Sequence, residues 1–310
     1  KSMVLRNCAG CGHARDGQFF SNNQWRKGPG VSRCTTCVEN NTLAGDGPDA
    51  STTRRENLAN RATFTAHDCK YPFAQGAHRY CAKGRYTSGT RKGQLCVTKW
   101  FKTGGVFEEH FFEHDIKASD KAVDLVREWN NRGFINKTIQ VNVPEVWTWL
   151  PGSEWAGQKN LTEPFIQNFE KFNSNSGWVS SNADSWSQVM QALSHFTYHV
   201  SSGQFVLCDL QGGVYRSTVV LTDPVIPSRS HRYGITDLGP EGISNFFYHH
   251  ECNRYCRSDW TRPKNTTSHF RPDQSTSMIL RSRQSVSQRY SRPVATLQTY
   301  AECDSDYDDY

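Results

Sequence analysis

Two closely spaced pairs of cysteines stand near the start of the chain. The pairs, Cys8-x-x-Cys11 and Cys34-x-x-Cys37, are separated by 22 residues. Each pair can hold two thiolates on a tight turn, and two such turns complete a tetrahedral zinc site. A module of about 40 residues has too little core to be stable alone, so the zinc would supply its folding energy. The alternatives are exposed redox pairs, or His13 in place of one cysteine. A closed four-thiolate site predicts a structural zinc.

A second group of metal-binding residue types lies at 249–256, where the sequence reads His-His-Glu-Cys-Asn-Arg-Tyr-Cys. Cys252 and Cys256 are four residues apart, so on a helix they would share a face. His250 is a plausible third ligand. Spacing alone leaves the fourth ligand open among His195, His199 and His231. Buried cysteines without a metal are the alternative.

The composition favours a reducing compartment for these cysteines. The chain has 11 cysteines in 310 residues and no apolar stretch of signal-peptide length at its start. An odd number with clustered pairs points to metal rather than a disulfide framework. We therefore expect a cytoplasmic protein, with the nucleus as the alternative. No apolar run approaches the length of a membrane span, and the chain begins at Lys1, which suggests a fragment or a processed product.

Composition divides the chain into four parts. Residues 1–42 form the expected zinc module, and 43–65 are a polar linker with little to bury. Residues 66–260 are rich in aromatic and β-branched residues and are long enough for a core. Residues 261–310 are rich in Ser, Thr and Arg and end in an acidic patch, which predicts a disordered tail. The net charge of +6 is weak evidence for nucleic acid binding.

The central region predicts a mixed α+β domain. Helical spacing of apolar residues indicates one helix over 118–131 and a second that Asp184 could cap. Pro240 at a helix start opens a third helix over 241–255. Alternation and apolar runs predict strands over 94–101, 204–210 and 219–223.

Five segments of this region resemble the alpha-kinases, a family of atypical protein kinases related to myosin heavy chain kinase and elongation factor 2 kinase. They occur in the family's order: Ala192-Leu-Ser-His-Phe-Thr-Tyr, Val206-Leu-Cys-Asp-Leu-Gln-Gly, Leu221-Thr-Asp-Pro, Gly234-Ile-Thr-Asp-Leu-Gly-Pro-Glu-Gly-Ile and Phe246-Phe-Tyr-His-His-Glu-Cys-Asn-Arg-Tyr-Cys. Val97-Thr-Lys, Glu163-Pro-Phe-Ile and Lys171-Phe-Asn-Ser-Asn look like the family's nucleotide-binding part. The resemblance covers about 66–260 and implies a bilobal kinase fold.

The resemblance also implies site residues, each with a chemical reason. Lys99 would present its ammonium group to the phosphates of ATP, and Glu163 would mark the hinge that binds the adenine edge. Asp209 would orient or deprotonate the substrate hydroxyl. Gln211 and Asp223 would supply the oxygen ligands that Mg²⁺ prefers. The glycine-rich turn would face phosphate or substrate with its backbone amides, through Gly234, Asp237 and Gly239.

For the second metal group, the resemblance implies a closed structural zinc with the ligands His195, His250, Cys252 and Cys256. Together with the N-terminal site this makes two zinc ions per chain. The sequence thus predicts an ATP- and Mg²⁺-dependent protein serine/threonine kinase. Its N-terminal module would bind a protein partner, and nucleic acid is the second choice. The alternative is a pseudokinase or adaptor that keeps the fold without phosphate transfer.

Overall fold

The computed structural model describes residues 5–8, 14–28, 31–35, 38, 55–76, 78–102, 104–181 and 185–274. Four sequence predictions fall partly or wholly outside these residues. They are the ligands Cys11 and Cys37, the helix cap Asp184, the linker before Arg55 and the tail beyond Gln274. Among the described residues, no helix combines the length and apolar character needed to cross a bilayer.

The N-terminal segment is a small unit around buried cysteines. The strands β1 (Arg6–Asn7) and β2 (Ala14–Arg15) pair antiparallel, followed by η1 (Gly17–Phe19) and α1 (Asn22–Arg26). Cys8 and Cys34 are buried beside Phe20, and the Cys34 N–H donates to Cys8 Sγ over 3.1 Å. Cys8 of the first predicted pair therefore lies next to Cys34 of the second. The four-cysteine zinc site stays a prediction because its other two ligands lie outside the described residues.

A six-stranded sheet follows, with strand order β3-β5-β6-β9-β8 and β4 on β5. Its strands pair antiparallel and are β3 (Ala62–Thr63), β4 (Ala74–Gln75), β5 (Arg79–Tyr86), β6 (Leu95–Phe101), β8 (Glu145–Thr148) and β9 (Lys159–Pro164). The short helix α3 (Ala66–Lys70) lies between β3 and β4 in the chain. Val97 pairs with Glu163, so Lys99, two residues on, shares the sheet face with Glu163.

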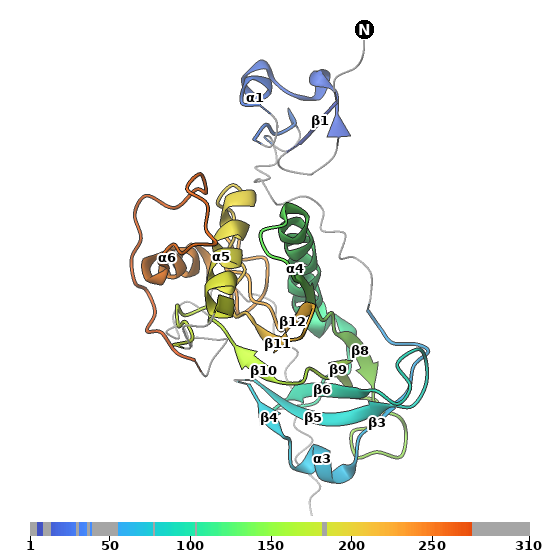
Figure 1. The fold of residues 1–310 in the computed structure, drawn as a ribbon. Coiled ribbons are helices and arrows are strands. Elements are labelled where there is room, and N and C mark those ends of the chain that lie inside the picture. Colours follow the sequence, from blue (N-terminus) through green and yellow to red (C-terminus); the bar gives the residue numbers. More distant parts are fainter. Residues whose placement is uncertain are drawn as a thin grey trace, which may run out of the picture. The chain divides into compact units, whose positions relative to one another are not determined.

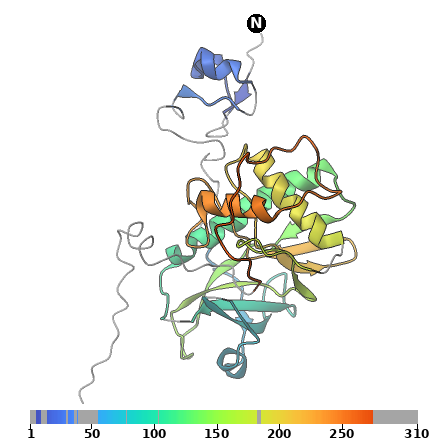
Figure 2. The ribbon, with the colours of Figure 1, turned by 90° about the vertical axis from the view of Figure 1, so that its left-hand side faces the viewer.

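A four-stranded sheet carries the second half of the domain (Figure 1). Its order is β10 (Phe169–Lys171), β11 (Gln211–Val214), β12 (Thr218–Thr222) and β7 (Thr138–Val141), with β12 parallel to β7. Helices α4 (Glu113–Arg132, after η2, Glu109–Phe112) and α5 (Ser185–Val200) contribute to the same apolar core as this sheet, around Trp129 and Phe196. Helix α6 (Gly239–His249) packs against α5 through Phe247 and Tyr198 (Figure 2).

Several predicted elements are confirmed and two need correction. Helix α4 and the strands β6 and β12 occur where the sequence indicates them, and Pro240 opens α6. The segment 204–210 forms only isolated bridges, such as Cys208 with Val225, instead of a strand. Helix α6 ends at His249, so Cys252 and Cys256 do not share a helix face. The helical spacing of these cysteines was coincidental, because the chain becomes extended at His250.

The folded domain extends beyond both predicted boundaries. Residues 55–65, placed in the linker, are part of the sheet: β3 pairs with β5, and Glu56 bridges Val146. Arg55 also forms a 2.5 Å ion pair with Asp120 of α4. Residues 261–274, placed in the tail, make hydrogen bonds to α5, α6 and the loop 173–178. The composition missed these segments because they are held by hydrogen bonds of their backbone and by single ion pairs such as Arg55–Asp120, which leave little trace in composition.

Candidate active site

Lys99 lies between two carboxylates from different strands. Its Nζ is 2.5 Å from Glu163 Oε1 and 2.7 Å from both carboxylate oxygens of Asp223. Thr222 Oγ1 donates to Glu163 at 2.7–2.8 Å. Lys99 and Glu163 are buried, whereas the Asp223 side chain is 45% exposed. The cluster therefore has one open side, at Asp223, from which a ligand can reach it.

The charges of this cluster are set by mutual pairing. Burial alone would lower the pKa of Lys99, but Asp223 and Glu163 outweigh it and raise that pKa. Burial raises the pKa of Glu163 despite the lysine. The pKa of Asp223 is lowered, because Lys99 overcomes the effect of burial on that carboxyl. A lysine held positive beside an ionised, half-exposed aspartate is suited to a ligand that carries both phosphate and a divalent cation.

Asp209 is buried and forms an ion pair with Lys171. The Lys171 Nζ, at the end of β10, lies 2.7 Å from Asp209 Oδ1. Asp209 and Asp223 both have left-handed backbone conformations, with φ of 57° and 49°. Such conformations are uncommon outside glycine and concentrate at functional sites. Lys171 opens one of the segments that resemble the family, but the sequence assigned it no role, because its partner Asp209 lies 38 residues further along the chain.

Gln211 lies at the same end of the four-stranded sheet as Asp223. It is the first residue of β11 and pairs with Thr222, the residue before Asp223. The amide of Gln211 and the carboxylate of Asp223 therefore stand on neighbouring strand ends. The structure thus brings together Lys99, Glu163 and Asp223, pairs Asp209 with Lys171, and places Gln211 beside Asp223.

Gly212 makes this strand pairing possible. Its φ is +156°, and a Cβ atom there would lie 1.9 Å from the carbonyl oxygen of Val220 on β12. We expect Gly212→Ala to reduce the free energy of unfolding by at least ~2 kcal/mol, since backbone atoms must move. Denaturant unfolding measures this, with Gly76→Ala as control because no atom lies within 4 Å of its added methyl. Equal stability of the two variants would contradict the tight pairing.

The glycine-rich loop 234–239 is organised by Asp237. The buried Asp237 carboxylate accepts hydrogen bonds from the backbone N–H groups of Ser228 (2.7 Å), Gly239 (2.9 Å) and Tyr233 (3.2 Å). An added Cβ at Gly239 would collide with the His231 ring. The Asp237 side chain thus shapes the loop, and any contact with phosphate would fall to other groups of the loop.

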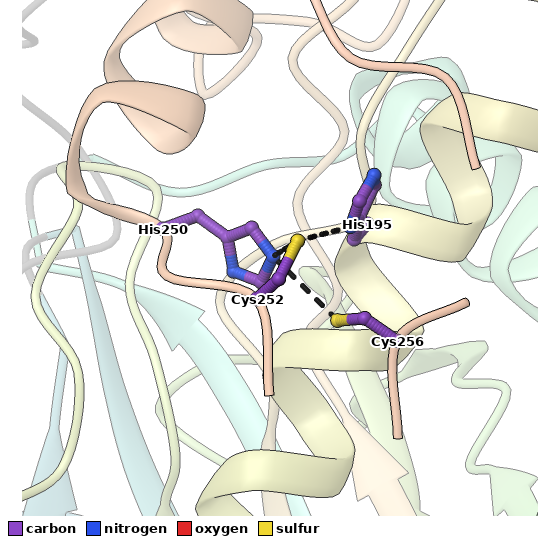
Figure 3. Close-up of side chains that lie close together, drawn as sticks. All are labelled: His195, His250, Cys252 and Cys256. Atoms are coloured by element: carbon purple, nitrogen blue, oxygen red, sulfur yellow. Dashed lines mark hydrogen bonds between the residues drawn. The ribbon is translucent and has the colours of Figure 1, made fainter. Parts of the chain in front are cut away.

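The second predicted metal group converges on one point (Figure 3). The ligand atoms of His195, His250, Cys252 and Cys256 all lie within 4.8 Å of one another. Cys252 Sγ is 3.6 Å from His195 Nδ1 and 3.9 Å from His250 Nε2, and Cys256 Sγ is 3.8 Å from His250 Nε2. In tetrahedral zinc sites, bond lengths of about 2.0 Å to nitrogen and about 2.3 Å to sulfur imply N···S separations of about 3.6 Å. The cluster therefore fits a zinc ion.

In each histidine, the ring nitrogen that faces away from the cluster makes a hydrogen bond. His250 Nδ1 lies 3.0 Å from Gln191 Oε1, and His195 Nε2 lies 3.1 Å from the Thr261 carbonyl. In each ring the proton is needed on the outer nitrogen, which leaves a lone pair on the inner one. Burial lowers the pKa of His195 to about 4 and that of His250 to about 3, so both rings are neutral near pH 7. Neutral, oriented imidazoles are what a metal site requires.

Fold and site together define a protein-kinase-like domain, and comparison with known proteins gives its family. Residues 74–256 match the alpha-kinase family profile, which is more than half of the chain. The chain belongs to the alpha-kinase family. The alpha-protein kinase vwkA of Dictyostelium discoideum is 36% identical over 207 residues, covering 65% of this chain and 32% of that protein. The eukaryotic elongation factor 2 kinase of Mus musculus is 40% identical over 89 residues, covering 28% of this chain and 12% of that kinase.

Solved structures of the same family share the fold. An alpha kinase from Entamoeba histolytica has a TM-score of 0.54 at 22% identity, covering 66% of this chain and 82% of that one. The alpha-kinase domain of myosin heavy chain kinase A, in complex with AMP, has a TM-score of 0.52 at 24% identity, covering 64% and 89%. These likenesses confirm the mixed α+β alpha-kinase fold. The chain spans about a third or less of these two curated relatives.

Proposed function

We propose that this chain is an ATP- and Mg²⁺-dependent protein serine/threonine kinase. The observation that carries the proposal is the buried Lys99, paired with Glu163 and Asp223 beside the Asp209–Lys171 pair. Phosphoryl transfer depends mainly on positioning and on neutralising charge, and this cluster provides both. Kinase domains with bound nucleotide are known in the family, among them the myosin heavy chain kinase A domain with AMP-PNP.

Each residue of the candidate active site has its own role in phosphoryl transfer. Asp209 orients the substrate hydroxyl and takes its proton, while the hydroxyl oxygen bonds to the γ-phosphorus and the bond to the ADP oxygen breaks. Lys99 contacts the phosphates, held in place by Glu163. Gln211 and Asp223 would hold Mg²⁺, which neutralises phosphate charge when bound. The Glu163 side chain is occupied by Lys99 and Thr222. Pro164 has no N–H and its carbonyl accepts from Asn142 Nδ2 over 2.9 Å, so we assign the adenine edge to the backbone beyond Pro164.

The glycine-rich loop is proposed to act through its backbone. Its amides from Gly234 to Gly239 would face phosphate or the substrate chain, while the Asp237 carboxylate keeps the loop in shape. The pseudokinase alternative has less support, because Lys99, Asp209 and Asp223 are all present and Lys99 pairs with Asp223.

We further propose two structural zinc ions. His195, His250, Cys252 and Cys256 would form a closed site that joins α5 to the chain after α6, and its geometry supports this assignment. Cys8, Cys11, Cys34 and Cys37 would form the second, in a module that binds a protein partner. The cytoplasm is the proposed location, because thiolate zinc sites persist where thiols stay reduced.

Lys99→Met tests the assignment of the phosphate contact. We expect kcat for transfer to a basic protein substrate to fall by at least about 100-fold, because the phosphates lose their cation. The free energy of unfolding should fall as well, since Glu163 is left buried without its cation. Radiolabelled ATP and thermal unfolding measure the two effects. Lys92→Met, at an exposed site, is the control; retention of wild-type kcat by Lys99→Met would refute the assignment.

A further inference from the structure

Residues 267–273 lie along α6 and the loop 173–178 and are held there through their backbone. The N–H groups of His269 and Phe270 donate to Asn245 Oδ1 over 2.9 and 3.0 Å. The Asp273 N–H donates to Ser176 Oγ over 2.9 Å, and Ser176 Oγ donates to the Asp273 carbonyl over 3.2 Å. Ser244 Oγ also accepts the Thr267 N–H over 2.8 Å. We call residues 267–273 the strap.

Two of the side chains that bind the strap, Asn245 and Ser176, are among the most deeply buried polar groups of the described domain. Asn245 and Ser176 are both 0% exposed. Asn245 also donates through Nδ2 to the Ser176 carbonyl over 2.8 Å, which joins the two binding groups to each other. Buried polar side chains cost free energy unless their hydrogen bonds are made, and here the strap backbone supplies the partners.

The strap is bound mainly through its backbone. All of its residues except Phe270, which is partly buried, are exposed, and the Ser268 hydroxyl lies 3.3 Å from His249 Nε2. A segment bound mainly through its backbone, with most side chains exposed, is held as an extended peptide is held in a groove. The groove itself depends on Gly177, where an added Cβ would lie 2.5 Å from the His249 ring and 3.0 Å from Asn245 Nδ2.

The bound loop leads directly to the proposed catalytic residues. Its first residue, Asn173, accepts the Leu210 N–H over 2.8 Å, next to Asp209. The preceding Phe172 N–H donates to the Leu210 carbonyl over 2.9 Å, and Lys171 pairs with Asp209. On the other side, Asn175 Nδ2 reaches the Thr236 carbonyl of the glycine-rich loop at 3.4 Å. The loop 173–178 thus connects the strap, which binds Ser176, to the segment that holds Asp209 and to the glycine-rich loop.

We propose that Asn245 and Ser176 form a peptide-binding groove that the strap occupies in cis, and that this occupancy positions the loop 173–178 for the Asp209 site. The first half concerns binding alone. The second half rests on the proposed kinase function. The strap acts as a positioning element, since it touches neither the reacting hydroxyl nor the nucleotide phosphates in this assignment.

Hydrogen exchange of the full-length chain tests the groove without any need for activity. We expect the amides of residues 269, 270 and 273 to be protected in the wild type. Ser176→Ala should speed exchange at 273 by about tenfold, which corresponds to the loss of about one buried hydrogen bond. Phe270→Pro removes one strap donor without altering the groove. Arg271→Ala, an exposed side chain in the strap, should change nothing. Unprotected amides in the wild type, or an equal effect of Arg271→Ala, would overturn the groove.

Steady-state kinetics of the same variants tests positioning. We expect Ser176→Ala and Phe270→Pro to lower kcat by about tenfold with the KM for ATP unchanged, and Arg271→Ala to match the wild type. If the strap loosens in both variants while kcat stays at the wild-type value, positioning is wrong. If the wild-type chain transfers no phosphate at all, the proposed kinase function fails, and the exchange result still decides the groove.

Discussion

Asp209→Asn should reduce phosphoryl transfer by about 10²–10⁴-fold, the range that a positioned general base contributes. Asparagine has nearly the same shape as aspartate and tolerates the left-handed backbone conformation found at Asp209, where φ is 57°. It loses the charge that pairs with Lys171 Nζ, 2.7 Å from Asp209 Oδ1, and it cannot take the proton of the substrate hydroxyl. The loss should therefore lie in kcat, with nucleotide affinity kept.

The experiment needs two readouts. Phosphate transfer from radiolabelled ATP to a basic protein measures kcat, and titration with a fluorescent ATP analogue measures binding. Asp124→Asn, on the exposed side of α4, is the matched control and should behave as wild type. Because Asp209 is fully buried against Lys171, thermal unfolding must confirm that Asp209→Asn remains folded. A folded variant with wild-type kcat would remove Asp209 from the chemistry.

Loss of a ligand from the proposed zinc site at His195, His250, Cys252 and Cys256 should have the largest effect on stability. We expect His250→Ala to lower the melting temperature by at least about 10 °C, because structural zinc supplies folding free energy directly and ~1 kcal/mol moves Tm by ~2–4 °C in a domain of this size. His250 Nε2 lies within 4 Å of both Cys252 Sγ and Cys256 Sγ, so its loss removes the ligand that neighbours both thiols. The thiols of Cys252 and Cys256 would then face each other without a cation.

Metal analysis separates this effect from a simple packing defect. The wild-type chain should carry two zinc ions if both proposed sites are filled, and His250→Ala should carry one fewer. His249→Ala is the control, because the neighbouring ring lies outside the cluster and bonds to Ser268 on the exposed side. Should His250→Ala retain the full zinc content and melting temperature, the assignment of this cluster as a metal site would be wrong.

The sequence pointed to the residues of both candidate sites but not to all of the local structure around them. Lys99 pairs with Asp223, Asp209 pairs with Lys171, and His195, His250, Cys252 and Cys256 converge. The helical reading of Cys252 and Cys256 was wrong. Four-residue spacing is shared by helices and by metal-binding turns, and only the extended conformation at His250 separates the two.

By itself the sequence determined the family, the mixed α+β class and the residue types of both sites, since these reside in motif composition and order. The tertiary structure alone decided the partners. Lys99 and Asp223 are 124 residues apart, and Ser176 and Asp273 are 97 apart. The partner of Lys171 and the position of the strap had no local signal, because an ion pair or a backbone hydrogen bond depends on where the other segment lies. Pairing across such distances is fixed by the packing of sheets and helices, which no short stretch of sequence specifies.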